Sequence, residues 1–325
     1  MRFTYLCAMQ VIVEQILILA IMGLIGWSAF RLKVIDQNHA EGLVKVILKI
    51  TLPLLIFTTF AGAELNKEML AAFPFVFGAA FVSVGVLFLL SKWSAKLQKL
   101  NRENTALHKT STMFGNVGFL GYPLLNAVFP GGEGLIYATI FQLGHDGLMW
   151  TWGIFILNSG AQQKSSQSWR HMINPTTFAF LAGILFFILK IKIPYILFEP
   201  LSGLGHTTIY LSMLYVGIVL ATVKMKSLLK NVRSYIVSLN KLIICPIIVL
   251  CCFYALQKAG VYIPFSAMGS AIMQSATPCM IIVSILAKEL NLNAKQSVEN
   301  IFISSILSMA TLPFIYFLIK EFLLF

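Results

Sequence analysis

Charged side chains are scarce in this chain of 325 residues. Only 11% of the residues are charged and only 12 are Asp or Glu, whereas a typical soluble domain has about 25% charged residues. The hydrophobic share is 58%, and the mean hydropathy is +0.84. A water-soluble core cannot absorb that much apolar surface, so the composition excludes an ordinary soluble protein and indicates a membrane protein.

The motifs of common enzymes and pumps are missing as well. The sequence has no G-x-S-x-G, H-E-x-x-H or phosphate-binding G-x-x-x-x-G-K-[ST] motif. The stretch "GHDG" (144–147) is similar to part of a metal-dependent hydrolase site, but the further His and Asp ligands of such a site are absent. We therefore predict no enzyme, no metal site and no cofactor.

Cysteine is also too rare and too dispersed for a metal or redox site. The five cysteines form no CxxC pair and have no His at metal-ligand spacing, which favours small buried hydrophobic residues. They are Cys7, Cys245, Cys251, Cys252 and Cys279.

Long apolar runs dominate the rest of the chain. Runs of about 20 apolar residues span the hydrocarbon of a bilayer, and ten of them occur. They lie near 10–30, 43–62, 72–91, 111–129, 135–158, 175–194, 203–223, 235–256, 264–287 and 298–319. Because backbone groups in lipid must be satisfied within a segment of this length, the spans are helices. The predicted fold class is an all-α polytopic membrane protein with about ten transmembrane helices.

The first run is retained rather than cleaved as a signal peptide. It continues to Phe30 without a small-residue cleavage site, and Arg31 and Lys33 follow it as membrane anchors.

The formal net charge of +12 would suggest nucleic acid in a soluble chain, but here the basic residues gather in alternate loops. Fifteen lie in the odd-numbered loops: Arg31, Lys33, Lys92, Lys96, Lys99, Arg102, Lys109, Lys164, Arg170, Lys224, Lys226, Lys230, Arg233, Lys288 and Lys295. Six lie in the even loops and termini: Arg2, Lys67, Lys190, Lys192, Lys258 and Lys320. This asymmetry predicts cytoplasmic odd loops, both termini outside a cytoplasmic (inner) membrane, lipid contact and no nucleic-acid partner.

Two halves of five spans each flank a polar stretch. We predict a first five-helix repeat at 1–158, a cytoplasmic linker at 159–174 and a second repeat at 175–325. An odd number of spans per half means that a duplicated half is inverted in the membrane, as in many secondary transporters. Spans four and nine correspond, since each carries a proline after small or polar residues, Pro123 and Pro278.

Both prolines predict interrupted helices. Pro123 should free backbone groups near Phe119 and Leu120, and Pro278 should do so near Gln274, because proline lacks an N–H and crowds the carbonyl four residues back. Such breaks survive in hydrocarbon only where protein buries them or where they line a wet cavity. We expect one shared cavity. The alternative is that the prolines only kink packed helices.

The interrupted helices predict an anion site. Their half-helix N-termini would present free N–H groups to a carboxylate, and Asn116, Asn126, Gln274 and Ser275 would add hydrogen bonds. Close helix crossing is expected along a stripe of small residues, Gly115, Gly118 and Gly121.

Several stretches together resemble one family. They are "ITLPLLIFTTFAG" (50–62), "GNVGFLGYPLL" (115–125), "GLIYATIFQLGHDGLMWTWGIFIL" (134–157), "INPTTFAFLAGILFFI" (173–188) and "ATPCMIIVSILAKEL" (276–290). The chain resembles the auxin efflux carrier family of membrane transport proteins, which includes plant PIN-FORMED carriers and bacterial malate-permease-like members.

The resemblance implies two inverted five-helix repeats, helices four and nine crossed at their prolines, and a transport domain that moves against a scaffold. It also implies organic-anion substrates, such as dicarboxylates or indole acetate, bound near the crossing. The positions that it carries over are Asn116, Pro123, Pro278, Pro53 and the "HDGLMW" stretch, with His145, Asp146 and Trp150.

The chain departs from the family pattern in two places, at Tyr210 and at the adjacent residues His145 and Asp146. Tyr210 stands where many relatives have proline, so the counterpart of Pro53 in the second half is missing. His145 and Asp146 stand where relatives more often have amides. Ionisable residues deep in a span are costly and indicate function, and a His next to an Asp can carry a transported proton. The alternative is that the two side chains diverge on the helix, that a neighbour satisfies each of them, and that Asp146 is protonated.

Lysines within spans have a simpler interpretation. Lys241 lies six residues inside span eight and is expected to snorkel to the cytoplasm. Lys45 and Lys49 lie four apart on one face of early span two and are also expected to snorkel; the alternative is that this basic stripe attracts an anion.

We therefore predict a secondary transporter of a small organic anion, with a proton or Na⁺ as the coupling ion. A sodium symporter similar to the bile acid carriers is one alternative, and an anion channel is another. A homodimer is compatible with the sequence.

Overall fold

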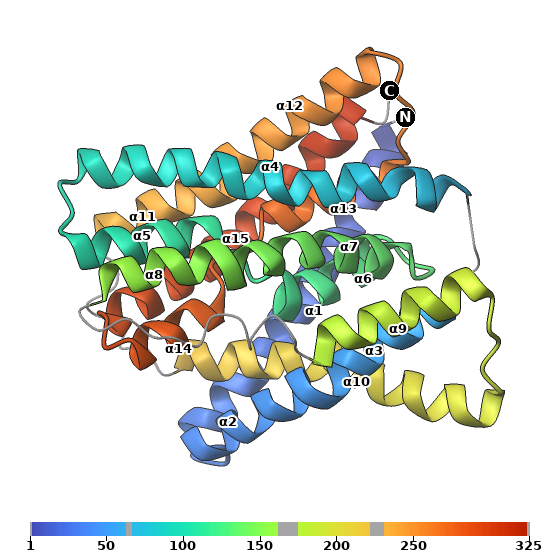
Figure 1. The fold of residues 1–325 in the computed structure, drawn as a ribbon, viewed down its shortest axis with the longest axis horizontal. Helices are drawn as coiled ribbons and strands as arrows, with labels where there is room; N and C mark the ends of the chain where they lie inside the picture. The colour runs from blue at the N-terminus through green and yellow to red at the C-terminus, as the bar shows by residue number, and fades with distance from the viewer. Residues whose placement is uncertain (1, 63–66, 162–174, 222–230, 324–325) are drawn as a thin grey trace.

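The protein is helical throughout the part that the computed structural model describes, residues 2–62, 67–161, 175–221 and 231–323. No strand occurs within these ranges, apart from one isolated bridge between extended residues. Each of the ten apolar segments predicted from the sequence contains helix (Figure 1). The all-α prediction is therefore confirmed.

The first half contains helices that correspond to spans one to five. They are α1 (Arg2–Arg31), α2 (Gln37–Val46), η1 (Ile47–Thr51), α3 (Leu52–Ala61), α4 (Lys67–Leu97), α5 (Arg102–Met113), η2 (Val117–Gly121), α6 (Tyr122–Val128), α7 (Glu133–Leu148), η3 (Met149–Gly153) and α8 (Ile154–Gly160). The elements η1, η2 and η3 are single π-helical turns that continue directly into the next helix.

The second half follows the same general plan. Its elements are α9 (Pro175–Leu189), α10 (Tyr195–Ala221), α11 (Val232–Leu239), the π turn η6 (Asn240–Ile244), α12 (Cys245–Lys258), α13 (Phe265–Ser275), α14 (Ile281–Glu289) and α15 (Ala294–Leu323). Within the predicted linker 159–174, residues 162–174 lie outside the described residues, while Ser159 and Gly160 belong to α8.

Five helical segments are long and apolar enough to cross a bilayer. These are Gln37–Ala61, Lys67–Leu97, Tyr195–Ala221, Val232–Lys258 and Lys295–Leu323. Shorter apolar helices lie at Val117–Val128 and Phe178–Leu189. The first of these belongs to a pair of interrupted segments, α5 to α6 and α13 to α14, in which two short helices replace one long helix.

Prolines follow π turns at three places. Pro53, Pro123 and Pro246 each occupy one of the first two positions of a helix that begins directly after η1, η2 or η6. Inside a helix, proline lacks one N–H donor and its ring crowds the carbonyl four residues back. A π turn just before it widens the helix and makes room for the ring. These prolines therefore leave their helices continuous.

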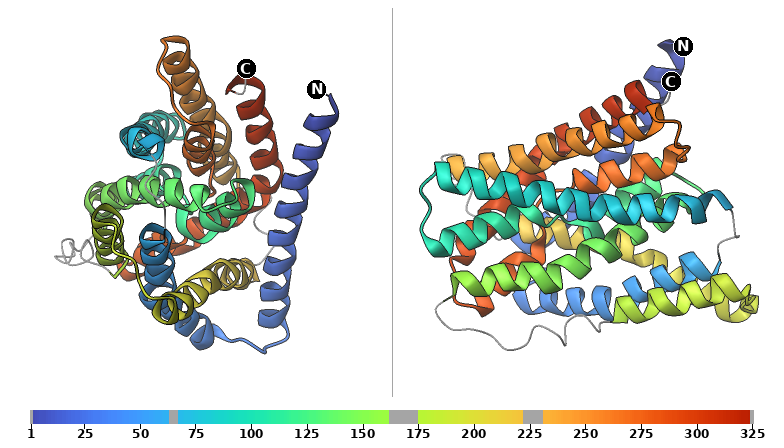
Figure 2. Two further views of the ribbon diagram at one scale, coloured as in Figure 1. Left: turned by 90° about the vertical axis from the view of Figure 1, so that its right-hand side faces the viewer. Right: turned by 45° about the horizontal axis from the view of Figure 1, so that its top comes forward.

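The helices form two groups. In the first, which we call the small group, α1 packs along α10, and α3 packs against both α9 and α10. The large group contains α4 to α8 and α11 to α15, with α4 packed on α5 and α7, and α11 packed on α15. Figure 1 shows α2, α3, α9 and α10 along one side of the large group, and Figure 2 shows α1 running along its flank.

Corresponding helices of the two halves have corresponding neighbours. The pair α1 with α10 matches the pair α9 with α3, and α4 packs on α7 as α11 and α12 pack on α15. Both interrupted helices pack on the helix that follows them in the chain. These pairings are the ones that an inverted repeat would exchange, and the repeat itself stays a prediction.

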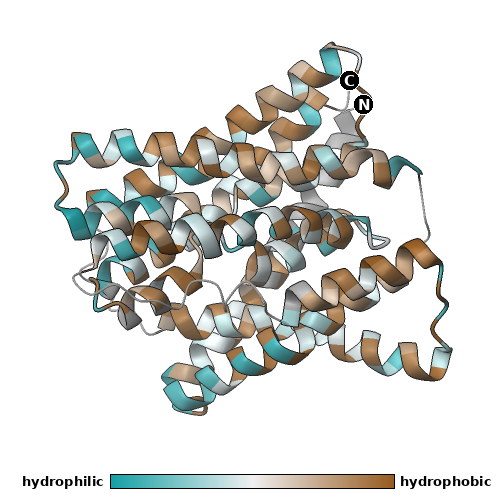
Figure 3. Ribbon diagram, viewed as in Figure 1, coloured by the Kyte–Doolittle hydropathy of each residue, from teal (hydrophilic) through white to brown (hydrophobic). Residues whose placement is uncertain are grey.

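The surface distribution of residues suits a bilayer. Hydrophobic residues predominate along the helices, while hydrophilic residues gather at helix ends, for example at the turn between α4 and α5 (Figure 3). Phe178 and Ile196 are largely exposed on this apolar surface. The start of α1 and the end of α15 lie at the same end of the molecule (Figure 1), as the predicted even number of crossings requires.

The cysteine prediction is right in part. Cys245 and Cys279 are buried, whereas Cys251 and Cys252 are exposed on α12. In a bilayer the outer face of α12 meets lipid, so small apolar side chains are suited to exposure there. The side chain of Cys7 lies outside the described residues.

Candidate functional site at the crossing of two interrupted helices

The two helix interruptions meet. α5 ends at Met113 and the helix resumes at Val117, while α13 ends at Ser275 and the helix resumes at Ile281. The extended residues between them pair as an antiparallel bridge, Gly115 with Cys279. Asn116 N–H donates to the Pro278 carbonyl at 2.7 Å, and Met280 N–H donates to the Phe114 carbonyl at 3.0 Å.

This pairing explains how the breaks persist inside the protein. A backbone N–H or C=O group without a hydrogen bond costs roughly several kcal/mol of free energy in hydrocarbon. Each extended segment supplies hydrogen-bond partners for backbone groups of the other segment. The two breaks are thus mutually dependent, and a single interrupted helix would lack these bonds.

The position of the first break corrects the sequence prediction. The break expected near Phe119 and Leu120 lies at Phe114–Asn116, and Pro123 starts α6 without interrupting it. The second break is where Pro278 predicts it, directly after Ser275. Proline fixes the break only in the second helix, because Pro278 is itself in the extended segment.

Two glycines permit the close approach of the segments. A Cβ on Gly115 would lie 2.3 Å from Thr277 Oγ1, and a Cβ on Gly121 would lie 2.2 Å from Gln274 Oε1. Gly118 differs, because its Cβ would meet Gln142 at an ordinary 3.7 Å. The predicted glycine stripe is therefore two separate contacts, one in the extended segment and one in η2.

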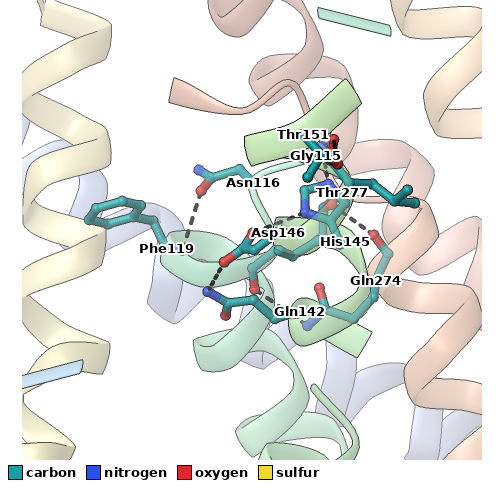
Figure 4. Close-up of polar contacts among 11 residues, drawn as sticks. Gly115, Asn116, Phe119, Gln142, His145, Asp146, Thr151, Gln274 and Thr277 are labelled. Carbon is teal, nitrogen blue, oxygen red and sulfur yellow. Dashed lines mark hydrogen bonds and ion pairs between the residues drawn. The ribbon is translucent and has the colours of Figure 1, made fainter. Parts of the chain in front are cut away.

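His145 reinforces the crossing from α7. Its Nε2 accepts a hydrogen bond from Gly115 N–H at 3.0 Å (Figure 4). Because that nitrogen is an acceptor, Nδ1 carries the proton of the neutral ring, and it lies 3.2 Å from Asp146 Oδ1. The tautomer of His145 is thus fixed by its two neighbours, and the ring is buried.

Asp146 faces hydrogen-bond donors on both oxygens. His145 Nδ1–H donates to Oδ1, and Gln142 Nε2–H donates to Oδ2 at 2.9 Å. The two side chains thus contact each other, and each also has a neighbour of its own, Gly115 N–H for His145 and Gln142 for Asp146.

A cavity of about 330 Å³ lies beside the crossing, between the two helix groups. From the small group it is lined by Ile47, Leu48, Lys49, Leu52, Pro175, Thr208 and Ser212. From the large group it is lined by Gly115, Asn116, Val117, Gly118, Phe119, Gln142, Asp146, Trp150, Met280, Ile281 and Ile282. Its volume is at the lower end of the range for small-molecule sites.

The cavity receives the N-termini of both resumed helices. Val117 and Gly118 begin the helix Val117–Val128, and Ile281 and Ile282 begin α14. The first N–H groups of a helix have no carbonyl in a preceding turn, and they carry partial positive charge. Asn116 satisfies one of them, since its Oδ1 accepts from Phe119 N–H at 3.2 Å. Four other residues of these first turns, Val117, Gly118, Ile281 and Ile282, line the cavity.

Polar atoms without partners also lie at this wall. Gln142 Oε1, Thr208 Oγ1 and Ser212 Oγ are buried and have no hydrogen-bond partner among the described residues. Buried polar groups are normally paired, so these atoms are candidates for ligand or water contacts. Thr208 and Ser212 lie one turn apart on the same face of α10.

The predicted site residues separate into three sets. Asn116, Asp146 and Trp150 line the cavity. Gly121, Gln274, Pro278 and His145 build the crossing, where Gln274 Nε2–H donates to the Val117 carbonyl at 3.3 Å. Pro53, Pro123 and Ser275 are buried outside the lining, and the Ser275 hydroxyl donates to its own helix at the Ile272 carbonyl. Asn126 also lies outside the lining.

Four polar or charged lining residues were not predicted as site residues: Lys49, Gln142, Thr208 and Ser212. Thr208 and Ser212 carry a weak signal, two small polar residues four apart in an apolar span. Lys49 was interpreted as snorkelling, and the structure adds that this exposed lysine borders the cavity. It supplies positive charge to the same space as Asp146.

The snorkelling prediction for Lys241 is wrong. Its side chain is fully buried, and Nζ donates to the Thr112 carbonyl at 3.2 Å. The cause is local, since the last turn of α5 offers carbonyls within reach of the ammonium.

Comparison with known proteins identifies the family of this chain. Residues 11–316 match the family described as membrane transport protein. The chain belongs to this auxin efflux carrier family. The match extends over both interrupted helices and nearly all of both halves.

Two archaeal relatives agree with the family assignment. An uncharacterized transporter of Methanothermobacter thermautotrophicus is 26% identical over 304 residues, covering 92% of this chain and 96% of the relative. An uncharacterized transporter of Methanocaldococcus jannaschii is 28% identical over 220 residues, covering 66% of this chain and 70% of the relative. The protein is thus a multi-pass member of a membrane transporter family.

Proposed function

We propose that the protein is a secondary transporter that moves a small organic anion across the cytoplasmic membrane by alternating access. The candidate substrates are a malate-like dicarboxylate and an auxin-like monocarboxylate. One observation carries the proposal: the cavity between the two helix groups is lined by the N-termini of both resumed helices. Helix N-termini bind carboxylates through free N–H groups and partial positive charge.

The other lining residues complete an anion site. The Asn116 side chain and the hydroxyls of Thr208 and Ser212 can donate hydrogen bonds, and Lys49 adds a positive charge. The Trp150 ring and nearby aliphatic side chains suit the apolar part of an organic acid. This combination favours a small anion with carbon substituents over a bare inorganic ion.

The location of the cavity supports alternating access. Substrate bound there would contact both groups, so a shift of one group against the other changes which side of the membrane the cavity opens to. The resemblance to the family, which implies a moving transport domain, points the same way. The inverted repeat and the outside location of both termini belong to this proposal, and a homodimer stays a prediction.

Proton coupling through Asp146 is the form of coupling that the contacts favour. An ionised Asp146 opposes an anion in the same cavity, and a proton on Asp146 removes that repulsion. His145 is less suited to carry the proton, because protonated Nε2 would face Gly115 N–H. Transport of anion and proton together follows from this arrangement.

Counterflow tests the proposal directly. Purified protein in liposomes loaded with an organic acid should exchange it for labelled external acid, with saturation. A thermal-shift screen of organic acids, repeated with Na⁺ and across pH, would select the substrate. The channel alternative predicts voltage-driven unitary currents without counterflow, and the sodium symporter alternative predicts counterflow that requires Na⁺.

Asn116 provides the sharpest residue-level test. Asn116→Ala removes the lining amide and also the helix cap, which costs about 1 kcal/mol of stability. Asn116→Asp keeps a capping oxygen but brings negative charge into the cavity, so anion affinity should fall about tenfold or more.

Asn126→Ala, which changes α6 away from the lining, is the matched control and should bind normally. Unchanged anion affinity in purified Asn116→Asp, measured by titration calorimetry, would contradict the site.

A further inference from the structure

A buried lysine lies behind the crossing. Lys241 belongs to η6, is 1% exposed and does not line the cavity. Its Nζ donates to the Thr112 carbonyl at 3.2 Å. A Cβ built on Gly115 would lie 3.2 Å from Nζ and 2.3 Å from Thr277 Oγ1. The ammonium therefore touches the point where the two extended segments pair.

The surroundings of Lys241 are the electronegative ends of the first half-helices. Thr112 is in the last turn of α5, and Thr277 follows the last turn of α13. Helix C-termini carry partial negative charge and carbonyls without intrahelical donors. The crossing is thus polarised, with helix N-termini at the cavity and helix C-termini at Lys241.

Lys241 has no carboxylate partner within ion-pair distance in the described part of the chain. The polar groups near it are the Thr112 carbonyl, the Thr277 hydroxyl, the thiols of Cys245 and Cys279, and the His145 ring. Carbonyl and hydroxyl oxygens at half-helix C-termini are the kind of ligands that hold a coupling Na⁺ in transporters with broken helices. Here a covalently attached cation occupies such a place.

We propose that Lys241 is a resident cation of the transporter. Its ammonium takes the place of a metal cation at the crossing, neutralises the C-termini of α5 and α13, and makes anion binding independent of Na⁺. This inference rests on the proposed function for the anion, and it separates the present chain from the sodium-symporter alternative.

Replacing Lys241 tests the proposed role of its ammonium as a cation, and the experiment needs no organic anion. In purified Lys241→Ala, the vacated space and the oxygen ligands should accept a small cation. Ethylammonium or Na⁺ should therefore raise the melting temperature of this variant saturably, while choline should not. Wild-type protein and Lys45→Ala, which changes an exposed lysine on α2 outside the cavity, should show no such response.

Charge-preserving and charge-removing variants provide the second measurement. Lys241→Arg should keep anion affinity within about threefold of wild type, while Lys241→Met should lose about tenfold or more in a Na⁺-free buffer. Wild-type anion affinity should be equal in sodium and choline buffers. If Lys241→Ala does not fold, production in the presence of ethylammonium should increase the yield of folded protein.

Two results would overturn the inference. One is a Lys241→Met variant with wild-type stability and anion affinity, which would make the charge irrelevant. The other is a wild-type requirement for Na⁺ in anion binding. Failure of the proposed function looks different, because counterflow would then be absent while the cation response of Lys241→Ala persisted.

Discussion

At the residue scale, the chemistry of the site depends on a few side chains with fixed hydrogen-bond roles. His145 accepts from the Gly115 backbone and donates to Asp146, and Gln142 donates to the same carboxylate. The neutral imidazole connects the crossing to the cavity wall, so a change of protonation at Asp146 reaches the backbone of the break. This makes Asp146 the coupling residue to test.

Asp146→Asn should separate coupling from binding. The amide cannot take up a proton, so uptake by the variant should not depend on external pH, whereas wild-type uptake should increase as external pH falls. The charged or titratable groups near Asp146 are His145, Tyr122 and, across the cavity, Lys49. Anion affinity should be kept or increased, because a negative charge is lost.

Glu133→Gln at the start of α7 is the matched control, and its uptake should keep the wild-type pH profile. Labelled-anion uptake into liposomes with imposed pH gradients measures both variants. A wild-type pH profile in Asp146→Asn would show that protons are coupled elsewhere.

At this scale, the sequence predicts site residues where a polar side chain lies in the middle of an apolar span. Asn116 and Asp146 are polar residues in the middle of spans, and they line the cavity. Trp150 lines it too, but only the family resemblance implied it. Thr208 and Ser212 escaped notice because small hydroxyl residues in membrane helices usually bond to their own backbone. Only the packing of α10 against the crossing leaves them without partners.

At the element scale, the interrupted helices show what a proline can and cannot predict. Pro278 lies in its break, whereas Pro123 lies in a continuous helix that begins six residues earlier. The first break is fixed by pairing with residues far along the chain, Pro278 to Met280. No local signal in the sequence specifies such a partner, which is why the prediction placed the break at the wrong residues.

The polar face of α10 permits a prediction with opposite effects on stability and binding. Thr208→Val combined with Ser212→Ala removes two buried hydroxyls that have no partner in the described structure. The free energy of unfolding should stay equal or increase by about 1 kcal/mol, because desolvated polar groups are lost. Anion affinity should fall about tenfold, because two donors leave the cavity wall.

Thr207→Val is the control on the same helix, since the Thr207 hydroxyl is exposed and donates to the Leu204 carbonyl. Thermal unfolding and calorimetric titration measure the two effects. If the double variant bound the anion as tightly as wild type, α10 would have no part in the site.

At the scale of the whole molecule, the apolar runs predicted the all-helical fold, and each of the ten runs contains helix, because span length depends on bilayer thickness. The division into two groups could not be derived in the same way. It depends on contacts between distant segments, such as α1 with α10 and α3 with α9. The family resemblance implied such a division, but the residues alone did not.

Relative motion of the two groups can be tested by joining them. Phe119 of η2 and Tyr215 of α10 face each other across the boundary, with ring centroids 5.5 Å apart. Phe57 of α3 and Phe186 of α9 lie within the small group at a similar 5.3 Å. Each pair would be changed to cysteine in a background with Cys7, Cys251 and Cys252 replaced by alanine.

A short, reducible bifunctional thiol reagent should have different effects on the two pairs. In the Phe119 and Tyr215 pair it should stop counterflow, because alternating access requires the groups to shift, and reduction should restore the rate measured before cross-linking. In the Phe57 and Phe186 pair it should leave counterflow unchanged, because helices within one group move together. Undiminished counterflow in the first pair after complete cross-linking would mean that the groups do not move against each other. The cavity between them would then need another way to open to each side.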